Sequence, residues 1–274
     1  KGKKNLQKDI IFDQISLKEN NNLIFGKKLI FSDNYKLNDL ELIKIDFLDK
    51  ENQKNEVQIS KKNKTYLING SSFNINSIVD NLLDSNIKKK TVFSDKKFKL
   101  ELNVKKIYFD KDTRMNNLKG FFILERNEIS ELNLLSNFSD KNNIKFTIKT
   151  KDGEKITTLF SHKAKPLVDR YKFIKGFNDG SLDFYSIKKD SQSKSTLKIY
   201  DFKLKELPAL TKLLTLASLQ GIADLLSGEG IRFNEFEMNF TNNDQLMTID
   251  EIYAIGPAIS ILMNGYIEKN RLIS

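Results

Sequence analysis

The 274-residue sequence contains no cysteine, no tryptophan and a single histidine. Without cysteine, disulfide bonds, thiolate metal ligands and cysteine nucleophiles are excluded. Without tryptophan, a glycan-binding or glycan-cleaving surface is disfavoured, because such surfaces usually present exposed aromatic rings, and cleavage also needs paired carboxylates beside a cleft.

Residues that commonly carry catalysis do not occur in a recognisable pattern. The single histidine, His162, has no acidic partner at an informative spacing. Gly228-Glu-Gly230 follows a predicted helix, whereas phosphate capture needs glycines that precede one. Asp110-Lys-Asp112 matches only the start of a calcium-binding loop. We therefore expect no enzymatic activity, no cofactor and no metal site.

The basic residues of the chain are not of the kinds that predominate in nucleic-acid-binding sites. The formal net charge is +10, carried by 41 lysines and only 5 arginines, in a chain that also has 29 asparagines. Base and phosphate recognition relies on arginine and stacking aromatic residues, and no such cluster is present. We interpret the lysines as a solvated basic face, suited to anionic lipid, and we expect no nucleic-acid partner.

Short apolar runs separated by turn residues predict a chain made mainly of β-strands. The sequence 19–22 and the lysine-rich stretch 61–64 are typical of hairpin turns, and Asp152-Gly153 is a strong hairpin signal. The predicted strands are 10–17, 23–31, 40–48, 57–59, 65–68, 98–109, 118–125, 129–135, 144–148, 155–160, 180–187 and 197–204, followed by three more after residue 231.

One strand shows a change of phase. Phe98, Leu100, Leu102 and Val104 alternate with polar residues, but the apolar positions then shift to Ile107 and Phe109. A one-residue slip in a period-two pattern predicts a bulge or a twist that turns the strand.

Three segments have helical spacing of apolar residues. Two are short, at 74–84, with Asn74 or Asn76 as the N-cap, and at 163–173. The third is the longest apolar stretch, and an amphipathic helix is predicted over 207–226, with Pro208 in its first turn and glycines after its end. About 20 residues would be long enough to span a membrane, but Lys212 and Asp224 disfavour this. We predict a helix that caps an apolar sheet surface, through Leu210, Leu213, Leu214, Ala217 and Leu225.

The predicted fold is mainly β with a few helices (α+β). It is an elongated, twisted antiparallel sheet forming an open groove, because the helices are too few to cover the apolar face of so many strands. A second sheet closing over that face is the alternative. Two continuous segments are expected: a β-meander over 1–206 and a helix-plus-three-strand segment over 207–274. Because the sequence has no initiator methionine and stops within a strand-like pattern, we expect it to belong to a longer protein.

The stretch LPALTKLLTLASLQGIADLLSGEGIRF, residues 207–233, resembles the signature of the AsmA-like family of bacterial envelope proteins, in its YhdP-like branch. Ala254-Ile-Gly-Pro-Ala258 and Asn264-Gly-Tyr-Ile267 are similar to that family's continuation. The specific likeness covers 207–267, and the first 206 residues agree only as a β-meander with short helices. The membrane anchor that members carry at the N-terminus is not in this sequence.

This resemblance implies a periplasmic protein anchored to the inner membrane, which carries phospholipid between the two membranes without catalysis. A groove with an apolar floor would shelter acyl chains, at about 0.8 kcal/mol for each buried CH₂ group. The expected partners are phospholipid, the membrane and unidentified envelope proteins. The alternative is a scaffold for outer-membrane biogenesis with a closed, lipid-free core. The residues expected to line the groove are Phe98, Leu100, Leu102, Val104, Phe236, Met238, Phe240, Ile259, Ile261 and Met263.

Overall fold

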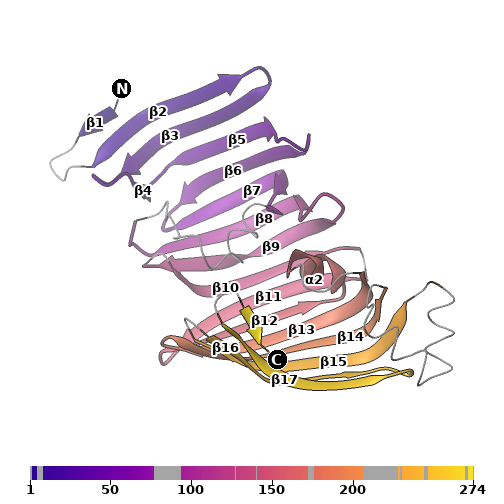
Figure 1. Ribbon diagram of the computed structural model, residues 1–274. Coiled ribbons are helices and arrows are strands. Elements are labelled where there is room, and N and C mark those ends of the chain that lie inside the picture. The colour runs from indigo at the N-terminus through magenta and orange to yellow at the C-terminus, as the bar shows by residue number, and fades with distance from the viewer. Residues whose placement is uncertain are drawn as a thin grey trace. The chain divides into compact units, whose positions relative to one another are not determined.

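The structure is a computed structural model that describes residues 2–4, 9–76, 94–126, 128–139, 141–171, 176–205, 228, 230–243, 246–268 and 271–273. The chain forms two compact units, Lys1–Lys141 and Asn142–Ser274. Both are built almost entirely from long β-strands, as predicted (Figure 1).

The first unit is a sheet in which neighbours in sequence are mostly neighbours in space. Strands β2, β3, β5, β6, β7, β8, β9 and β10 pair in that order, with β1 and β4 as short additions to β2 and β3. The bounds are β1 Gly2–Lys4, β2 Ile10–Glu19, β3 Asn22–Phe31, β4 Leu37–Asp39, β5 Leu42–Leu48, β6 Lys54–Lys62, β7 Thr65–Asn74, β8 Phe98–Tyr108, β9 Arg114–Glu125 and β10 Glu128–Asn137. The hairpin turns after β2 and β6 contain Asn20 and Asn63 with positive φ, 51° and 57°.

The prediction of a purely antiparallel sheet is wrong at one pair, because β7 and β8 run parallel, with Thr65 opposite Lys99 and Asn74 opposite Tyr108. Parallel neighbours need a crossover of a dozen or more residues. The chain between β7 and β8 is long enough to return to the starting end of β7 before β8 begins. A hairpin turn would have forced the antiparallel arrangement.

The change of phase along β8 is confirmed by burial. Val104 and Ile107 are both buried, whereas Lys105 and Lys106 between them are exposed. The pairing of β8 with β9 keeps its register there, and the irregularity lies in nearby strand pairs, at Glu56/Val57 of β6 and at Leu135/Asn137 of β10. The predicted bulge is therefore not found in β8 itself, which keeps its register with both β7 and β9.

In the described residues, the second unit is a meander of eight antiparallel strands paired in sequence order, with one short helix. The bounds are β11 Asn143–Lys151, β12 Glu154–Ser161, α2 Lys165–Tyr171, β13 Phe177–Lys189, β14 Gln192–Leu204, β15 Ile231–Asn242, β16 Leu246–Ile255, β17 Ser260–Glu268 and β18 Arg271–Ile273. The helix predicted at 163–173 is observed over Lys165–Tyr171, and residues 172–173 lie outside the described part of the chain. Asp152 and Gly153 have positive φ, 53° and 78°, as the predicted hairpin requires.

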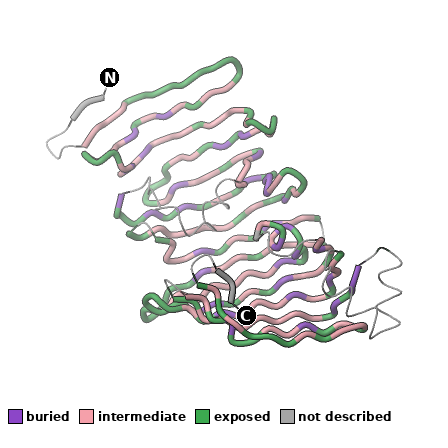
Figure 2. The backbone as a smooth tube through the Cα atoms, viewed as in Figure 1, coloured by how far each residue is buried: buried purple, intermediate pink, exposed green. Residues whose placement is uncertain are grey.

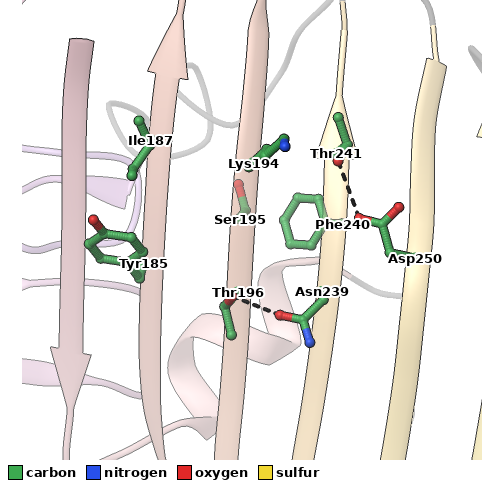
Figure 3. A pocket seen from close by; sticks show the side chains of 9 residues that line it. All are labelled: Tyr185, Ile187, Lys194, Ser195, Thr196, Asn239, Phe240, Thr241 and Asp250. Carbon is green, nitrogen blue, oxygen red and sulfur yellow. Dashed lines mark hydrogen bonds between the residues drawn. The ribbon is translucent and has the colours of Figure 1, made fainter.

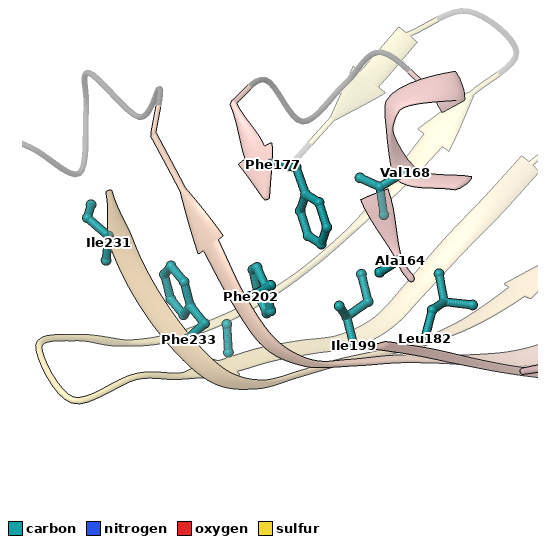
Figure 4. Packing of buried hydrophobic residues seen from close by; sticks show 9 residues of the cluster. Ala164, Val168, Phe177, Leu182, Ile199, Phe202, Ile231 and Phe233 are labelled. Atoms are coloured by element: carbon teal, nitrogen blue, oxygen red, sulfur yellow. The ribbon is translucent and has the colours of Figure 1, made fainter. Parts of the chain in front are cut away.

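The core of the second unit lies on one side of its sheet, under α2. Val168 of α2 and Ala164, which precedes it, pack in one cluster with Phe177, Phe202 and Phe233 from three successive strands (Figure 4). Phe202 is stacked between the other two rings, with centroid distances of 5.2 Å to each. This aromatic stack holds one end of β13, β14 and β15 together.

Several predictions lie outside the described residues. These are the body of the helix at 74–84, the long helix at 207–226 and the segment boundary at 207. Of the first helix the structure describes the proposed cap, in which the Asn74 Oδ1 atom accepts a hydrogen bond from the Asn76 N–H at 2.9 Å. The helix-capping residues Leu210, Leu213, Leu214, Ala217 and Leu225 also lie outside the described part of the chain.

Candidate functional site

The candidate site is one face of the sheet in the second unit, where apolar side chains line up from strand to strand. At the middle of the strands, each apolar residue is the register partner of the next, from β11 across to β17. We call this set the apolar row: Phe146, Leu159, Phe184, Leu197, Met238, Ile252 and Met263. It is uninterrupted by any polar residue over seven strands.

The apolar row is only half covered. Its first six members have intermediate exposure, and Met263 is 39% exposed. Residues of this intermediate class run along most strands of the unit (Figure 2). A residue in a closed two-layer core would be buried almost completely. In the described part of the unit, this apolar surface therefore remains accessible.

The opposite face of the same strands is polar. Successive side chains of a strand point to opposite faces, so the neighbours of the row place Thr158, Tyr185, Thr196 and Asn239 on the other side. The Thr196 hydroxyl donates a hydrogen bond to the Asn239 Oδ1 atom at 2.7 Å (Figure 3). The two faces of the sheet are thus chemically different, as the alternation in the sequence predicts.

A hollow of about 480 Å³ lies around these polar residues. Its lining mixes hydroxyl, amide, lysine and aromatic side chains, and Thr241 donates a hydrogen bond to Asp250 across it at 3.2 Å (Figure 3). No histidine or cysteine is among the lining residues.

The polar face is held by a charged network centred on Glu237. The Lys198 Nζ atom lies 2.6 Å from the Glu237 Oε2 atom, the Tyr253 hydroxyl donates to Oε2 at 2.8 Å, and the Asn239 amide donates to Oε1 at 2.9 Å. The hydrogen bond from Lys198, with those from Asn239 and Tyr253, lowers the pKa of Glu237 although burial opposes this. The hydrogen bond with Glu237 in turn raises the pKa of Tyr253 to about 12.

We expect Glu237→Gln to lower the free energy of unfolding at neutral pH by on the order of 1 kcal/mol. Because the pKa of Glu237 is lower in the folded state, its stabilisation is present above the pKa of an unfolded glutamate, about 4.3. That stabilisation is lost as the pH falls through the folded-state value. Urea unfolding of the wild type and the variant between pH 7 and pH 3 measures this, and the difference should shrink at the acid end.

The control for this prediction is Glu251→Gln, which removes an exposed carboxylate on the neighbouring strand. It should leave the free energy of unfolding nearly unchanged at every pH. If the free energies of unfolding of the wild type and Glu237→Gln differed by the same amount over the whole pH range, the stabilising role of the ionised Glu237 in this network would be contradicted.

The first unit has an apolar face of the same kind. Register partners form a second continuous row from β2 to β9: Leu17, Ile24, Ile45, Val57, Gly70, Val104 and Leu118. In β2 and β3 its members are exposed to solvent, with Leu17 62% and Ile24 42% exposed. In β6 and β8 they are buried, with Val57 6% and Val104 2% exposed. Coverage of this face therefore increases from β2 towards β8.

Tyr66 shows how the first unit accommodates a polar atom in its apolar cluster. The ring packs beside Phe98 and Leu100, and its hydroxyl donates to the Asp39 Oδ1 atom at 2.7 Å. Burial, followed by this hydrogen bond, raises the pKa of Tyr66 above its usual range. For Asp39, burial acts to raise the pKa, but the hydrogen bonds from Lys61, Tyr66 and the Leu40 N–H outweigh it and leave the pKa lowered.

The structure places the predicted lining residues on these apolar faces but with different exposures. In β8, Phe98, Leu100 and Val104 are buried and Leu102 is half-buried. In the second unit, most of the predicted residues are half-buried, and only Met263 belongs to the exposed class: Phe236, Met238, Phe240, Ile259, Ile261 and Met263. Ile259 lies just before β17 and packs against the aromatic cluster.

The sequence reasoning missed five of the seven residues of the apolar row, namely Phe146, Leu159, Phe184, Leu197 and Ile252. Each belongs to a strand that the alternation had already predicted. The signal was present within each strand, but pairing between strands aligns these positions, and alternation alone does not define that pairing.

The side chain of His162 makes packing and hydrogen-bond contacts with its neighbours. It is exposed, its ring packs edge-on against Phe160 with a centroid distance of 4.6 Å, and its Nδ1 atom accepts a hydrogen bond from the Asn143 N–H at 3.2 Å. Among the residues that the structure describes, no group of three or more histidine or acidic side chains is placed to hold a metal ion. Within the same ranges, no helix has the length and hydropathy needed to cross a membrane.

Comparison of the chain with protein-family models, with curated proteins and with solved structures finds no match in any of the three.

Proposed function

We propose that this protein binds phospholipid by its acyl chains on the apolar sheet face of each unit and carries it along an open groove. The observation that supports the proposal is the apolar row, which crosses seven strands without a polar side chain and is only half covered. Water in contact with so extended an apolar surface is unfavourable, and a bound acyl chain would replace it.

The energetics suit a carrier. Each CH₂ group taken from water contributes about 0.8 kcal/mol, so a chain held along several rows would be bound firmly. Along the apolar row every strand presents an apolar side chain, and movement from one strand to the next would then cost little net free energy. No catalytic group is needed for such transport, and the polar head group would remain in water at the edge of the sheet.

The cellular setting of the proposal comes from the resemblance of residues 207–267 to the AsmA-like family. It would place the protein in the periplasm, anchored to the inner membrane, with phospholipid passing between the two membranes of the envelope. The unidentified envelope partners expected from the sequence belong to the same proposal.

The test compares two aromatic residues that are adjacent in β13 and lie on opposite faces. Phe184→Asp places a carboxylate in the apolar row, and Tyr185→Asp places one on the polar face, where Tyr185 is 44% exposed. We expect the first variant to reduce co-purifying phospholipid, measured by mass spectrometry after extraction, at least about tenfold, or about 1.4 kcal/mol. The second should retain the wild-type amount.

Met263 and Leu262 provide a second pair that carries less risk of unfolding. Both are exposed, at 39% and 74%, and only Met263 belongs to the apolar row. Met263→Asp should lower lipid content with an unchanged thermal midpoint, and Leu262→Asp should lower neither. Lipid-free wild-type protein, which also fails to extract lipid from vesicles, would favour the scaffold with a closed core instead. Substitution of Leu100 is less informative, because this residue is 4% exposed and belongs to the packed cluster.

A further inference from the structure

The polar face of the second unit carries the hollow of about 480 Å³ around Thr196 and Asn239 (Figure 3). Sites for small molecules usually enclose about 300–1,000 Å³ and are lined mainly by apolar side chains. The hollow has this size, but most of its lining side chains are polar. It lies on the opposite side of the sheet from the apolar row, so an acyl chain bound to that row would not occupy it. A ligand that fits the hollow would therefore itself be polar.

An irregularity in the sheet brings an additional carboxylate to the hollow. The register of β15 against β16 shifts after Asn239, which pairs with Glu251, and Asp250 is the extra residue on β16. Regular alternation would send the adjacent Asp250 and Glu251 to opposite faces. Because of the bulge, Asp250 instead reaches the Thr241 hydroxyl on the polar face. Bulges that re-aim a side chain in this way are common beside functional sites.

The hydrogen-bonding groups of the hollow hold one another in place. The Asn239 amide is fixed at both ends, because its Oδ1 atom accepts from the Thr196 hydroxyl at 2.7 Å and its Nδ2 atom donates to Glu237 at 2.9 Å. The Asp250 Oδ2 atom accepts from Thr241 at 3.2 Å. These bonds use only part of the capacity, since an amide has two hydrogens and a carboxylate has about four acceptor sites. The hollow therefore offers donors and acceptors whose positions are set before a ligand binds.

Tyr185 gives the hollow an exposed aromatic ring. It lies on β13, at one side of the hollow, and is 44% exposed (Figure 3). Tyrosine has an apolar ring and a polar hydroxyl, so the ring can pack against C–H groups of a ligand while the hydroxyl stays hydrated. The charges of the lining residues balance, with one ammonium group on Lys194 and one carboxylate on Asp250. These features together suit a neutral ligand that has an apolar face and several hydroxyls.

We propose that the hollow binds a neutral saccharide, with one pyranose ring against Tyr185 and ring hydroxyls hydrogen-bonded to Asn239 and Asp250. A pyranose has a face of C–H groups and an edge of hydroxyls, and each hydroxyl both donates and accepts hydrogen bonds. The absence of tryptophan disfavoured a glycan-binding surface, but an exposed tyrosine supplies the ring that such a surface needs. The inference goes beyond the proposed function, because lipid and saccharide would occupy opposite faces of the sheet.

The experiment titrates the full chain with cellotetraose or with chitotetraose, two neutral oligosaccharides, and follows binding by calorimetry. We expect the wild type to bind at least one of them, and Tyr185→Ala to weaken that binding at least about tenfold, or about 1.4 kcal/mol. Asp250→Asn should also weaken it, because an amide nitrogen replaces an acceptor oxygen. Since the ligand carries no charge, raising the salt concentration should leave the Kd nearly unchanged.

The matched control is Tyr35→Ala, which removes the same side chain from a position in the first unit that is 77% exposed. It should keep the wild-type Kd. Co-purifying phospholipid should be equal in the wild type, Tyr185→Ala and Tyr35→Ala, and this measurement separates the inference from the proposed function. A wild type that binds neither oligosaccharide at millimolar concentration would overturn the saccharide site and leave lipid carriage intact. Wild-type affinity in both Tyr185→Ala and Asp250→Asn would overturn it as well.

Discussion

Phe202→Ala is expected to lower the free energy of unfolding by about 3–5 kcal/mol, the usual range for removing a buried phenylalanine side chain. Phe202 is 4% exposed and is the middle ring of the aromatic stack, with Phe233 at an interplanar angle of 12° and Phe177 at 16°. Phe236 adds an edge-on contact at 6.5 Å. Truncation would leave a cavity with three rings around it, and two of them would lose their stacking partner.

This loss is large because whole domains are stable by only about 5–15 kcal/mol. The measurement is urea unfolding of the full chain, with the slope compared between variants. Tyr185→Ala is the control, since it removes an aromatic side chain of similar size from the neighbouring strand at a position that is 44% exposed. Equal losses for the two variants would mean that the stack does not hold the end of β13, β14 and β15 together.

Gly120→Ala is expected to have the second-largest effect on stability. Gly120 of β9 has a φ of +142°, a conformation that L-residues with side chains rarely adopt. An added Cβ atom would lie 1.9 Å from the Asn133 carbonyl oxygen of β10, which is backbone and cannot rotate away. We expect the strained φ to cost about 1–3 kcal/mol, with a further cost because β9 and β10 must separate.

Gly153→Ala separates the two contributions. Gly153 also has a positive φ, +78°, but its added Cβ atom would meet nothing within 4 Å. Gly153→Ala should therefore lower the free energy of unfolding only by the conformational contribution, about 1 kcal/mol. Hydrogen exchange of the amides in β9 and β10 provides a second measurement, and protection there should fall in Gly120→Ala alone. Similar losses for both variants would contradict the close approach of the two strands.

Local patterns in the sequence were sufficient to predict the strands, their turns and one helix. Period-two alternation located the strands, asparagines and Asp152-Gly153 located turns, and the helix after His162 was found from apolar spacing. These signals are local, because each depends on a few adjacent residues and on backbone conformations that those residues favour. The same alternation separated an apolar from a polar face within each strand, and so indicated the chemistry of the candidate site.

The tertiary structure decided which strands meet and in what register. The parallel pairing of β7 with β8 depends on the path of a long crossover, and no local pattern distinguishes it from a hairpin. Alignment of Phe184 with Leu159 and Leu197, and of Tyr185 with Thr196, likewise follows from contacts between strands. Burial was decided at the same level: Leu100 and Met263 were both predicted to line the groove, but Leu100 is 4% exposed and Met263 39% exposed. The physical reason is that alternation assigns a side chain to a face, whereas its coverage depends on what packs above that face.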